Sequence, residues 1–379
     1  MAKKNQLTII RYAAQGSRII FAFFLLLLAK NQGDITNYGR LLNINAIYAM
    51  LTSVAIMPFI NKLWEKYEFI SVIKQLSKCF IIISILMFII FYNFSSIYNL
   101  LIVIIGSYIF VFTNILIQFF QSQSKLFFKV PAIVLTINFF SVIIIMFANS
   151  FLELIIFYFL PYLIVLFFLP HFYKELNEKK VKEKCKLKDT YDFFKNLYGW
   201  SLVVSLCWPI AFFIIREIVS VRDIKIWENY EFTFRVFLSV LGLASAFIIN
   251  YNLHDMKNKL YDVTKTLITK SLVPSYILSV LAFVFLFLYL INISVIDLVL
   301  FFMAYLIKII LLSLSYPLFG VFKIKPIAII EILNSVLLVG LIYINISVAF
   351  SIFISTLISG FSIFYIWKKT IISKNKLFK

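Results

Sequence analysis

The stretch PHFYKELNEKKVKEKCKLKDTYDFFKN, residues 170–196, is strongly basic and separates two long apolar halves of the chain. It contains eight lysines, which are Lys174, Lys179, Lys180, Lys182, Lys184, Lys186, Lys188 and Lys195. Loops rich in lysine stay on the cytoplasmic side of a membrane. The stretch therefore predicts a cytoplasmic linker that joins two membrane-embedded halves, and it fixes the orientation of the segments on either side.

The composition excludes a soluble globular protein. The 379 residues are 63% hydrophobic and 18% aromatic, with a mean hydropathy of +0.98, which is typical of a polytopic membrane protein. The net charge of +19 comes from lysines in short linkers between apolar runs, so it indicates loop retention and contact with anionic lipid instead of nucleic-acid binding. The three cysteines and two histidines show no metal-ligand or disulfide spacing, and we expect neither metal nor cofactor.

Twelve apolar stretches are long enough to cross the hydrocarbon core, which takes about 20 helical residues at about 1.5 Å each. The predicted spans are 7–29, 42–60, 77–95, 97–120, 128–148, 151–170, 197–217, 227–250, 269–291, 294–315, 326–345 and 347–367. The predicted fold class is an all-α polytopic membrane protein with about 12 transmembrane helices in two six-helix lobes. The predicted domains are an N-terminal lobe (1–170), a basic cytoplasmic linker (171–196) and a C-terminal lobe with a basic tail (197–379).

The distribution of positive charge supports this count of spans. If both termini are cytoplasmic, about 27 of the 36 lysines and arginines fall on inner segments, about 5 on outer segments and about 4 inside spans. Omitting one span inverts every later loop and scatters the positive charges over both sides. We therefore predict that both termini and the linker are cytoplasmic.

Basic residues lie inside the first predicted span of the N-terminal half. Arg11, Gln15 and Arg18 follow the spacing i, i+4, i+7, so they project from one helical face. If the helix begins near Leu7, Arg18 lies about 16 Å into the membrane. A basic side chain at the centre of a span costs about 2.5–3.5 kcal/mol on insertion scales, so each one requires a reason.

A similar pattern occurs in the C-terminal half. Glu228, Glu231 and Arg235 share one face of the span 227–250, and Arg235 lies about 12 Å from its outer end. Two interpretations remain open for the embedded arginines. One is an ion pair with Glu228, Glu231 or Glu331, and the other is a cationic cavity for an anionic substrate, because a guanidinium group binds phosphate oxygens through a planar fork of donors.

Weaker signals come from other embedded polar groups. Lys308, in the middle of the span 294–315, either faces the same cavity or pairs with an acid. Glu331 and Asn334 share a face of the span 326–345, and they either pair with Lys308 or bind a coupling cation. Trp208 and Pro209 predict a kink in the span 197–217.

The stretch IAFFIIREIVSVRDIKIWENYEFTFRVF, residues 210–237, resembles a family signature. It is similar to the second half of the Wzx-type flippases, which translocate lipid-linked oligosaccharides such as O-antigen units and belong to the multidrug/oligosaccharidyl-lipid/polysaccharide exporter (MOP) superfamily. Arg216, Trp227 and Arg235 occupy the matching places. The run 34–68 also resembles the stretch that joins the first two spans of that family. Together these motifs cover about a fifth of the chain.

This resemblance implies two six-helix lobes around a central cavity that opens alternately to either side of the bacterial inner membrane. The implied substrate is an undecaprenyl-diphosphate-linked oligosaccharide, whose lipid tail stays in the bilayer, for lipopolysaccharide or other surface-polysaccharide assembly. A polysaccharide polymerase and chain-length machinery are the further implied partners, and no nucleic acid is implied. The candidate substrate-binding residues are Arg18, Arg235, Arg11, Gln15, Arg216, Arg222, Arg40 and Lys308.

Two other functions stay open at this point. A polytopic enzyme of the same pathway, either a polymerase or a glycosyltransferase, needs a large outer loop or an acidic pair on the first outer loop. The predicted outer loops are short and Asp34 stands alone in the first one, so we expect no enzyme activity. A cation-coupled drug exporter of the same fold places acids in its cavity where this sequence places arginines.

Overall fold

The computed structural model describes residues 13, 17, 20–21, 23–31, 38–39, 44–45, 64, 66–91, 97–122, 129–175, 183–189, 199–249, 260–289, 293–320 and 324–377. These residues are almost all helical, and the part of the chain so described contains one isolated β-bridge, between Tyr67 and Glu183. The chain divides into two compact units, Met1–Gly199 and Trp200–Lys379.

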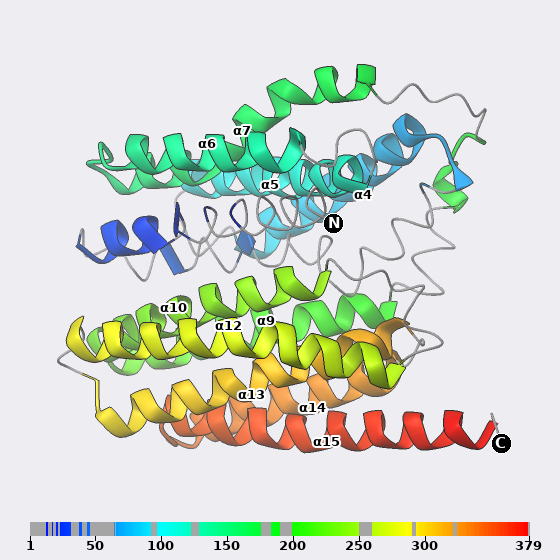
Figure 1. Cartoon of the computed structure of the whole chain (residues 1–379). Helices are drawn as coiled ribbons and strands as arrows, with labels where there is room; N and C mark the ends of the chain where they lie inside the picture. Colours follow the sequence, from blue (N-terminus) through cyan, green and yellow to red (C-terminus); the bar gives the residue numbers. More distant parts are fainter. Residues whose placement is uncertain are drawn as a thin grey trace. The chain divides into compact units, whose positions relative to one another are not determined.

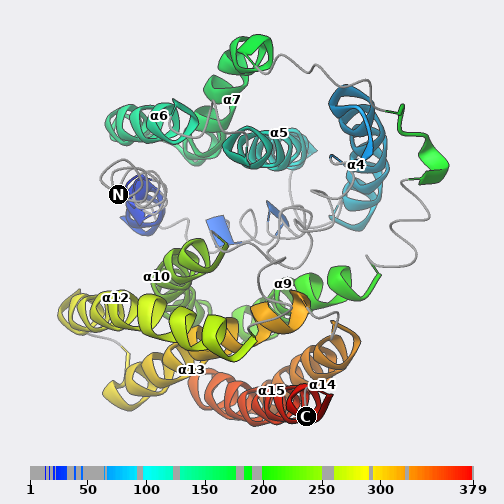
Figure 2. The same cartoon turned by 45° about the vertical axis from the view of Figure 1, so that its right-hand side comes forward.

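Helices of the first unit pack along their lengths. They are α4 (Phe69–Phe91), α5 (Ile97–Ser122), α6 (Lys129–Ile145) and α7 (Phe151–Glu175). Helix α7 packs against both α5 and α6, and α4 packs against α5 (Figure 2). A Cβ atom at Gly106 of α5 would overlap the ring of Phe159 on α7. The missing side chain therefore allows α5 and α7 to approach closely.

The described helices of the second unit are labelled in Figure 1. They are α9 (Gly199–Arg222), α10 (Ile224–Ile249), α12 (Leu260–Tyr289), α13 (Val295–Gly320), α14 (Ile324–Tyr343) and α15 (Val348–Leu377). Helix α13 is central, because it packs against α10, α12, α14 and α15. Asp223 is the only residue between α9 and α10, and its Oδ1 accepts hydrogen bonds from the backbone N–H of Lys225 (3.0 Å) and Ile226 (3.1 Å). This N-cap ends one helix and starts the next within a single turn.

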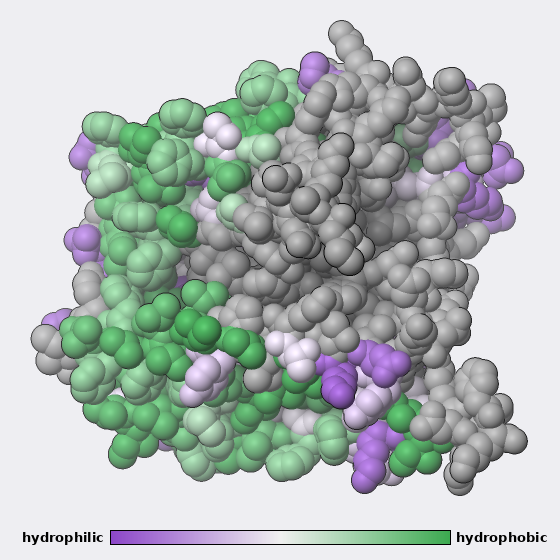
Figure 3. All heavy atoms as spheres, viewed as in Figure 1, coloured by the Kyte–Doolittle hydropathy of each residue, from purple (hydrophilic) through white to green (hydrophobic). Residues whose placement is uncertain are grey.

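The surfaces of both units are rich in apolar side chains, as expected for contact with lipid. Four described stretches are long and apolar enough to cross a membrane: Asn99–Ile117, Val295–Ser315, Ile324–Tyr343 and Val348–Ile372. In the second unit, apolar residues cover most of the face shown in Figure 3, and hydrophilic residues gather towards the end where α15 finishes. A chain with this pattern is a multi-pass membrane protein.

The helices follow the predicted spans but several extend beyond them. Helix α12 begins at Leu260 where the sequence predicts 269, and α15 continues to Leu377 where it predicts 367. Hydropathy detects only the part of a helix that lies in hydrocarbon, whereas the backbone hydrogen bonds continue through polar residues such as Lys265. The predicted span 42–60 lies almost entirely outside the described residues. The arrangement of two lobes around a cavity stays a prediction.

Candidate functional site

Three charged side chains form a buried cluster in the second unit, which we call the arginine–glutamate cluster. It consists of Arg216 on α9 with Glu231 and Arg235 on α10. Arg216 donates from Nε and Nη2 to Glu231 Oε2 (3.1 and 3.0 Å) and from Nη2 to Oε1 (3.2 Å). Arg235 donates from Nε to Glu231 Oε1 at 2.7 Å. The three residues are only 0–7% exposed, so this carboxylate is shared by two guanidinium groups away from solvent.

The local fold brings these residues together. Glu231 and Arg235 lie one helical turn apart on α10. Because the chain reverses at Asp223, Arg216 on α9 lies opposite Glu231, roughly 10–12 Å along each helix from Asp223. The rings of Phe212 and Phe234 stack next to the cluster with their centroids 3.8 Å apart. The cluster therefore lies between α9 and α10, next to a pair of stacked aromatic rings.

The hydrogen-bonded group contains two positive charges and one negative charge. Nη1 of Arg216 is buried without a hydrogen-bond partner among the described residues, and so is Nε1 of the neighbouring Trp227. The Arg216 guanidinium lies 6.0 Å from the centroid of that indole ring. A buried donor without a partner costs about 1–3 kcal/mol. These two buried donors favour an anionic ligand, above all one with phosphate oxygens.

A second group of polar residues, the lysine–glutamate cluster, lies in the middle of the same unit. It consists of Trp208 on α9, Lys308 on α13, Glu331 on α14 and Ser359 on α15. Trp208 donates from Nε1 to Glu331 Oε2 at 3.0 Å, and Ser359 Oγ lies 3.5 Å from Oε1. Lys308 places Nζ over the face of the Trp208 ring and interacts electrostatically with Glu331. This cluster has equal numbers of positive and negative charges.

The candidate substrate-binding residues divide among three places. Arg216 and Arg235 meet in the arginine–glutamate cluster, and Lys308 lies in the lysine–glutamate cluster. Arg222, at the end of α9, donates to the backbone carbonyls of Ile342 (2.9 Å) and Tyr343 (3.0 Å) at the end of α14. There it binds carbonyl groups that a helix C-terminus leaves without partners. The remaining candidates, which are Arg11, Gln15, Arg18 and Arg40, lie outside the described residues.

Two contributors to these clusters were not expected from the sequence. Trp208 was expected to mark a kink, yet its indole joins Lys308 and Glu331. The available signal was a tryptophan in the middle of a span in a chain that also embeds a lysine and a glutamate. Ser359 gave no signal, because small polar residues are common between transmembrane helices.

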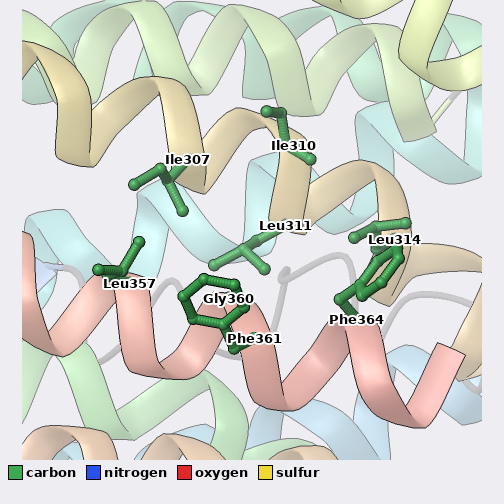
Figure 4. A pocket seen from close by; sticks show the side chains of 8 residues that line it. All are labelled: Ile307, Ile310, Leu311, Leu314, Leu357, Gly360, Phe361 and Phe364. Atoms are coloured by element: carbon green, nitrogen blue, oxygen red, sulfur yellow. The ribbon is translucent and has the colours of Figure 1, made fainter. Parts of the chain in front are cut away.

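An apolar pocket of about 220 Å³ lies between α13 and α15 in the second unit. Figure 4 shows its lining, with Ile307, Leu311 and Leu314 on α13 facing Leu357, Gly360 and Phe364 on α15. A Cβ atom at Gly360 would lie 3.3 Å from Cγ2 of Ile307, so the glycine helps to keep this space open. The pocket is suited to a hydrocarbon chain and offers no polar group to orient a head group.

No family model and no curated protein matches the sequence. Solved structures do match, over nearly the full length. A MATE mutant is 14% identical with a TM-score of 0.68, covering 98% of this chain and 96% of that chain. The outward-facing conformation of a multidrug resistance MATE family transporter of the MOP superfamily is also 14% identical (TM-score 0.66, covering 98% and 95%).

A third solved structure is a MOP superfamily transporter from Pyrococcus furiosus, in which reverse polarity of the binding pocket suggests a different function. It is 12% identical with a TM-score of 0.60, and the match covers 96% of this chain and 94% of that chain. These likenesses confirm the predicted fold class, an all-α polytopic membrane protein with a MATE-like arrangement of helices.

Proposed function

Because the chain has the fold of MOP superfamily transporters, we propose that it translocates undecaprenyl-diphosphate-linked oligosaccharides across the bacterial inner membrane by alternating access. The product serves surface-polysaccharide assembly such as that of O-antigen. The observation that carries the proposal is the buried arginine–glutamate cluster, in which two arginines share one glutamate and Nη1 of Arg216 has no hydrogen-bond partner among the described residues.

The chemistry of such a substrate fits this cluster. A diphosphate head group cannot cross hydrocarbon unaided, because an ionised group there loses its hydration. Guanidinium groups provide planar forks of donors, and Glu231 leaves Nη1 of Arg216 without a hydrogen-bond partner among the described residues. The isoprenoid tail remains in the bilayer while the sugar head moves. Arg11, Gln15, Arg18 and Arg40 are the contributions that we propose from the N-terminal lobe.

Export of a cationic drug is less well supported for this chain. A cation site requires an acid that is available to the ligand. Glu231 binds two arginines, and Glu331 interacts with Lys308 and Trp208. The Pyrococcus furiosus transporter shows that a MOP fold can occur with reverse pocket polarity. An anionic substrate is therefore the better match to these residues.

The proposed orientation places both termini and the linker 170–196 in the cytoplasm. Cysteine labelling of intact cells tests it at two exposed positions. In a background with Cys79, Cys185 and Cys207 replaced by serine, Val221→Cys, at a residue 86% exposed, should react with an impermeant maleimide. Lys184→Cys should react only after the cells are permeabilised. Reaction at Lys184→Cys in intact cells contradicts the orientation.

Purified protein in proteoliposomes tests the transport itself. The vesicles contain an undecaprenyl-diphosphate oligosaccharide with a fluorescent sugar, and dithionite bleaches only the label in the outer leaflet. The protein should increase the fraction that becomes bleached beyond that of empty vesicles. A parallel assay follows accumulation of ethidium, a cationic drug. Transport of ethidium with no movement of the labelled lipid would establish the drug-exporter alternative instead.

A further inference from the structure

A short part of the basic linker, which we call the docked segment (residues 183–189), is bound to the start of α4 in the first unit. The backbone N–H of Glu68 donates to the carbonyl of Glu183 at 2.8 Å, within the β-bridge between Tyr67 and Glu183. Cys185 donates its N–H to Ser71 Oγ at 2.9 Å. Its carbonyl accepts from Nε2 of Gln75 at 3.4 Å.

The docking orients the segment with one side towards the protein. Cys185 is only 4% exposed and faces α4. Lys184 and Lys188 are exposed, and so is Leu187 between them, at 51%. Within the segment, the backbone N–H of Lys186 donates to Oδ2 of Asp189 at 2.9 Å. This bond stabilises the short helical turn at residues 187–189. The segment thus presents lysines and one leucine on the outside of the first unit.

Helix α4 continues the same surface into the membrane. Its exposed residues lie on one helical face at spacings of three and four. They are Ile70, Lys74, Lys78, Ile81, Ile82, Ile85 and Ile89. The four later isoleucines are 54–67% exposed and form a lipid-facing stripe. Lys74 and Lys78 are exposed at the start of this stripe, the place where basic side chains reach head groups when an apolar stripe contacts lipid.

We propose that Lys74 and Lys78 on α4, with Lys184 and Lys188 of the docked segment, form a binding surface for anionic phospholipid head groups of the cytoplasmic leaflet. Residues 66–78 and 183–189 contain six lysines among their described members against three acids. The cytoplasmic leaflet carries negative surface charge that attracts such lysines. The exposed Leu187 and the isoleucine stripe place this charge against lipid and not in bulk solvent.

The proposal is independent of the transported molecule, and Cys185 provides its readout. With Cys79 and Cys207 replaced by serine, Cys185 is the sole thiol, and in the docked segment it is buried against α4; we expect undocking to expose it. The protein is reconstituted in vesicles of phosphatidylcholine, with or without one quarter phosphatidylglycerol, and alkylation by N-ethylmaleimide is followed by mass spectrometry. We expect the anionic lipid to slow alkylation at least about fivefold, the contribution of a single lysine near an anionic surface.

Two double variants distinguish specific contact from bulk charge. Lys184→Gln/Lys188→Gln should lose the slowing, whereas Lys368→Gln/Lys369→Gln, which removes two exposed lysines of the second unit, should retain it. Equal alkylation rates in the two lipid mixtures, or equal behaviour of the two double variants, would overturn the proposal.

Two serine substitutions on α4 test the docking itself. Ser71→Ala removes the acceptor for the N–H of Cys185, so alkylation should be faster in both lipid mixtures. The matched change Ser77→Ala, on the same helix, should leave the rate unchanged. If Cys185 is alkylated no faster in the Ser71→Ala variant than in the Ser77→Ala variant, the docking of the segment does not depend on this contact and the proposed surface is wrong.

Discussion

The interiors of the two units use polar residues in opposite ways. In the described part of the first unit, the buried polar side chains are uncharged. Asn138 donates to Ser17 Oγ at 3.2 Å, and Asn45 donates to the Tyr158 hydroxyl at 2.7 Å. The second unit instead buries Arg216, Glu231 and Arg235. Neutral hydrogen bonds hold helices together at little cost, whereas buried ions are expensive and mark function. Among the described residues, the proposed ligand chemistry therefore falls to the second unit.

Removing the acid that joins the two arginines should have the largest effect. Glu231→Gln leaves two guanidinium groups close together without a counter-charge, so we expect a loss of about 3–5 kcal/mol of unfolding free energy. Thermal unfolding in detergent and the yield of folded protein measure it. Glu228→Gln changes the same kind of residue one turn earlier, at a half-buried position, and should have a much smaller effect. Equal stability of the two variants would contradict the cluster.

Removing one of the two arginines of the arginine–glutamate cluster should strongly reduce transport without unfolding the protein. Arg216→Gln and Arg235→Gln each leave one arginine paired with Glu231. The excess positive charge then disappears, and translocation of the labelled lipid should fall about 10- to 100-fold, the value of one or two charge-assisted hydrogen bonds. Arg235→Lys keeps the positive charge but lacks the planar fork of donors, so its rate of translocation should lie between those of the original protein and Arg235→Gln.

Arg222→Gln is the matched control for these variants. It removes the same charge from the end of α9, where the guanidinium binds the carbonyls of α14, and should retain most of the transport. Normal transport by both Arg216→Gln and Arg235→Gln would exclude the cluster as a phosphate site.

The lysine–glutamate cluster should behave as a coupled pair with a smaller effect. Lys308→Met leaves Glu331 without its basic neighbour, and Glu331→Gln does the converse. The double variant removes both charges. We therefore expect its loss of unfolding free energy to be smaller than the sum of the two single losses by about 0.5–3 kcal/mol. Thermal unfolding of the three variants gives this coupling. Simple additivity would show that the two charges do not interact in the folded protein.

The smallest effect is expected in the first unit. Asn138→Ala removes the hydrogen bond to Ser17 and should cost about 1 kcal/mol of stability, with transport unchanged. Ser141→Ala, on the same helix, removes only a bond to the carbonyl of Ile137 in the preceding turn and should be nearly neutral. A transport defect in Asn138→Ala at normal stability would show that the first unit's neutral interior also contacts the substrate.

The positions of the helices were largely predictable, because hydropathy and the placement of charge depend on residues that are close together in the sequence. The predicted span 97–120 and the observed α5 (Ile97–Ser122) differ only at one end. The spacing of Glu231 and Arg235 also follows from the helical repeat, and these residues do form an ion pair. Local periodicity is sufficient for both inferences.

Contacts between distant segments could not be predicted in the same way. The sequence alone could not show that Arg216 pairs with Glu231. Glu228, Glu231 and Glu331 were all possible acidic partners for the embedded arginines. Arg222 was a candidate substrate-binding residue, a role that stays untested, but its binding to the end of α14 depends on a fold-specific approach of two helices. The docked segment depends on backbone groups and Ser71, which leave no pattern in the sequence.

The close approach at Gly106 has a consequence for the history of this sequence. A side chain at that position would collide with the ring of Phe159 and require α5 or α7 to shift, so we expect selection to disfavour substitutions there. At Gly340 a methyl group would meet no described atom within 4 Å, and the position is free to drift. Divergent members of this lineage should therefore share the first glycine long after the second has been replaced.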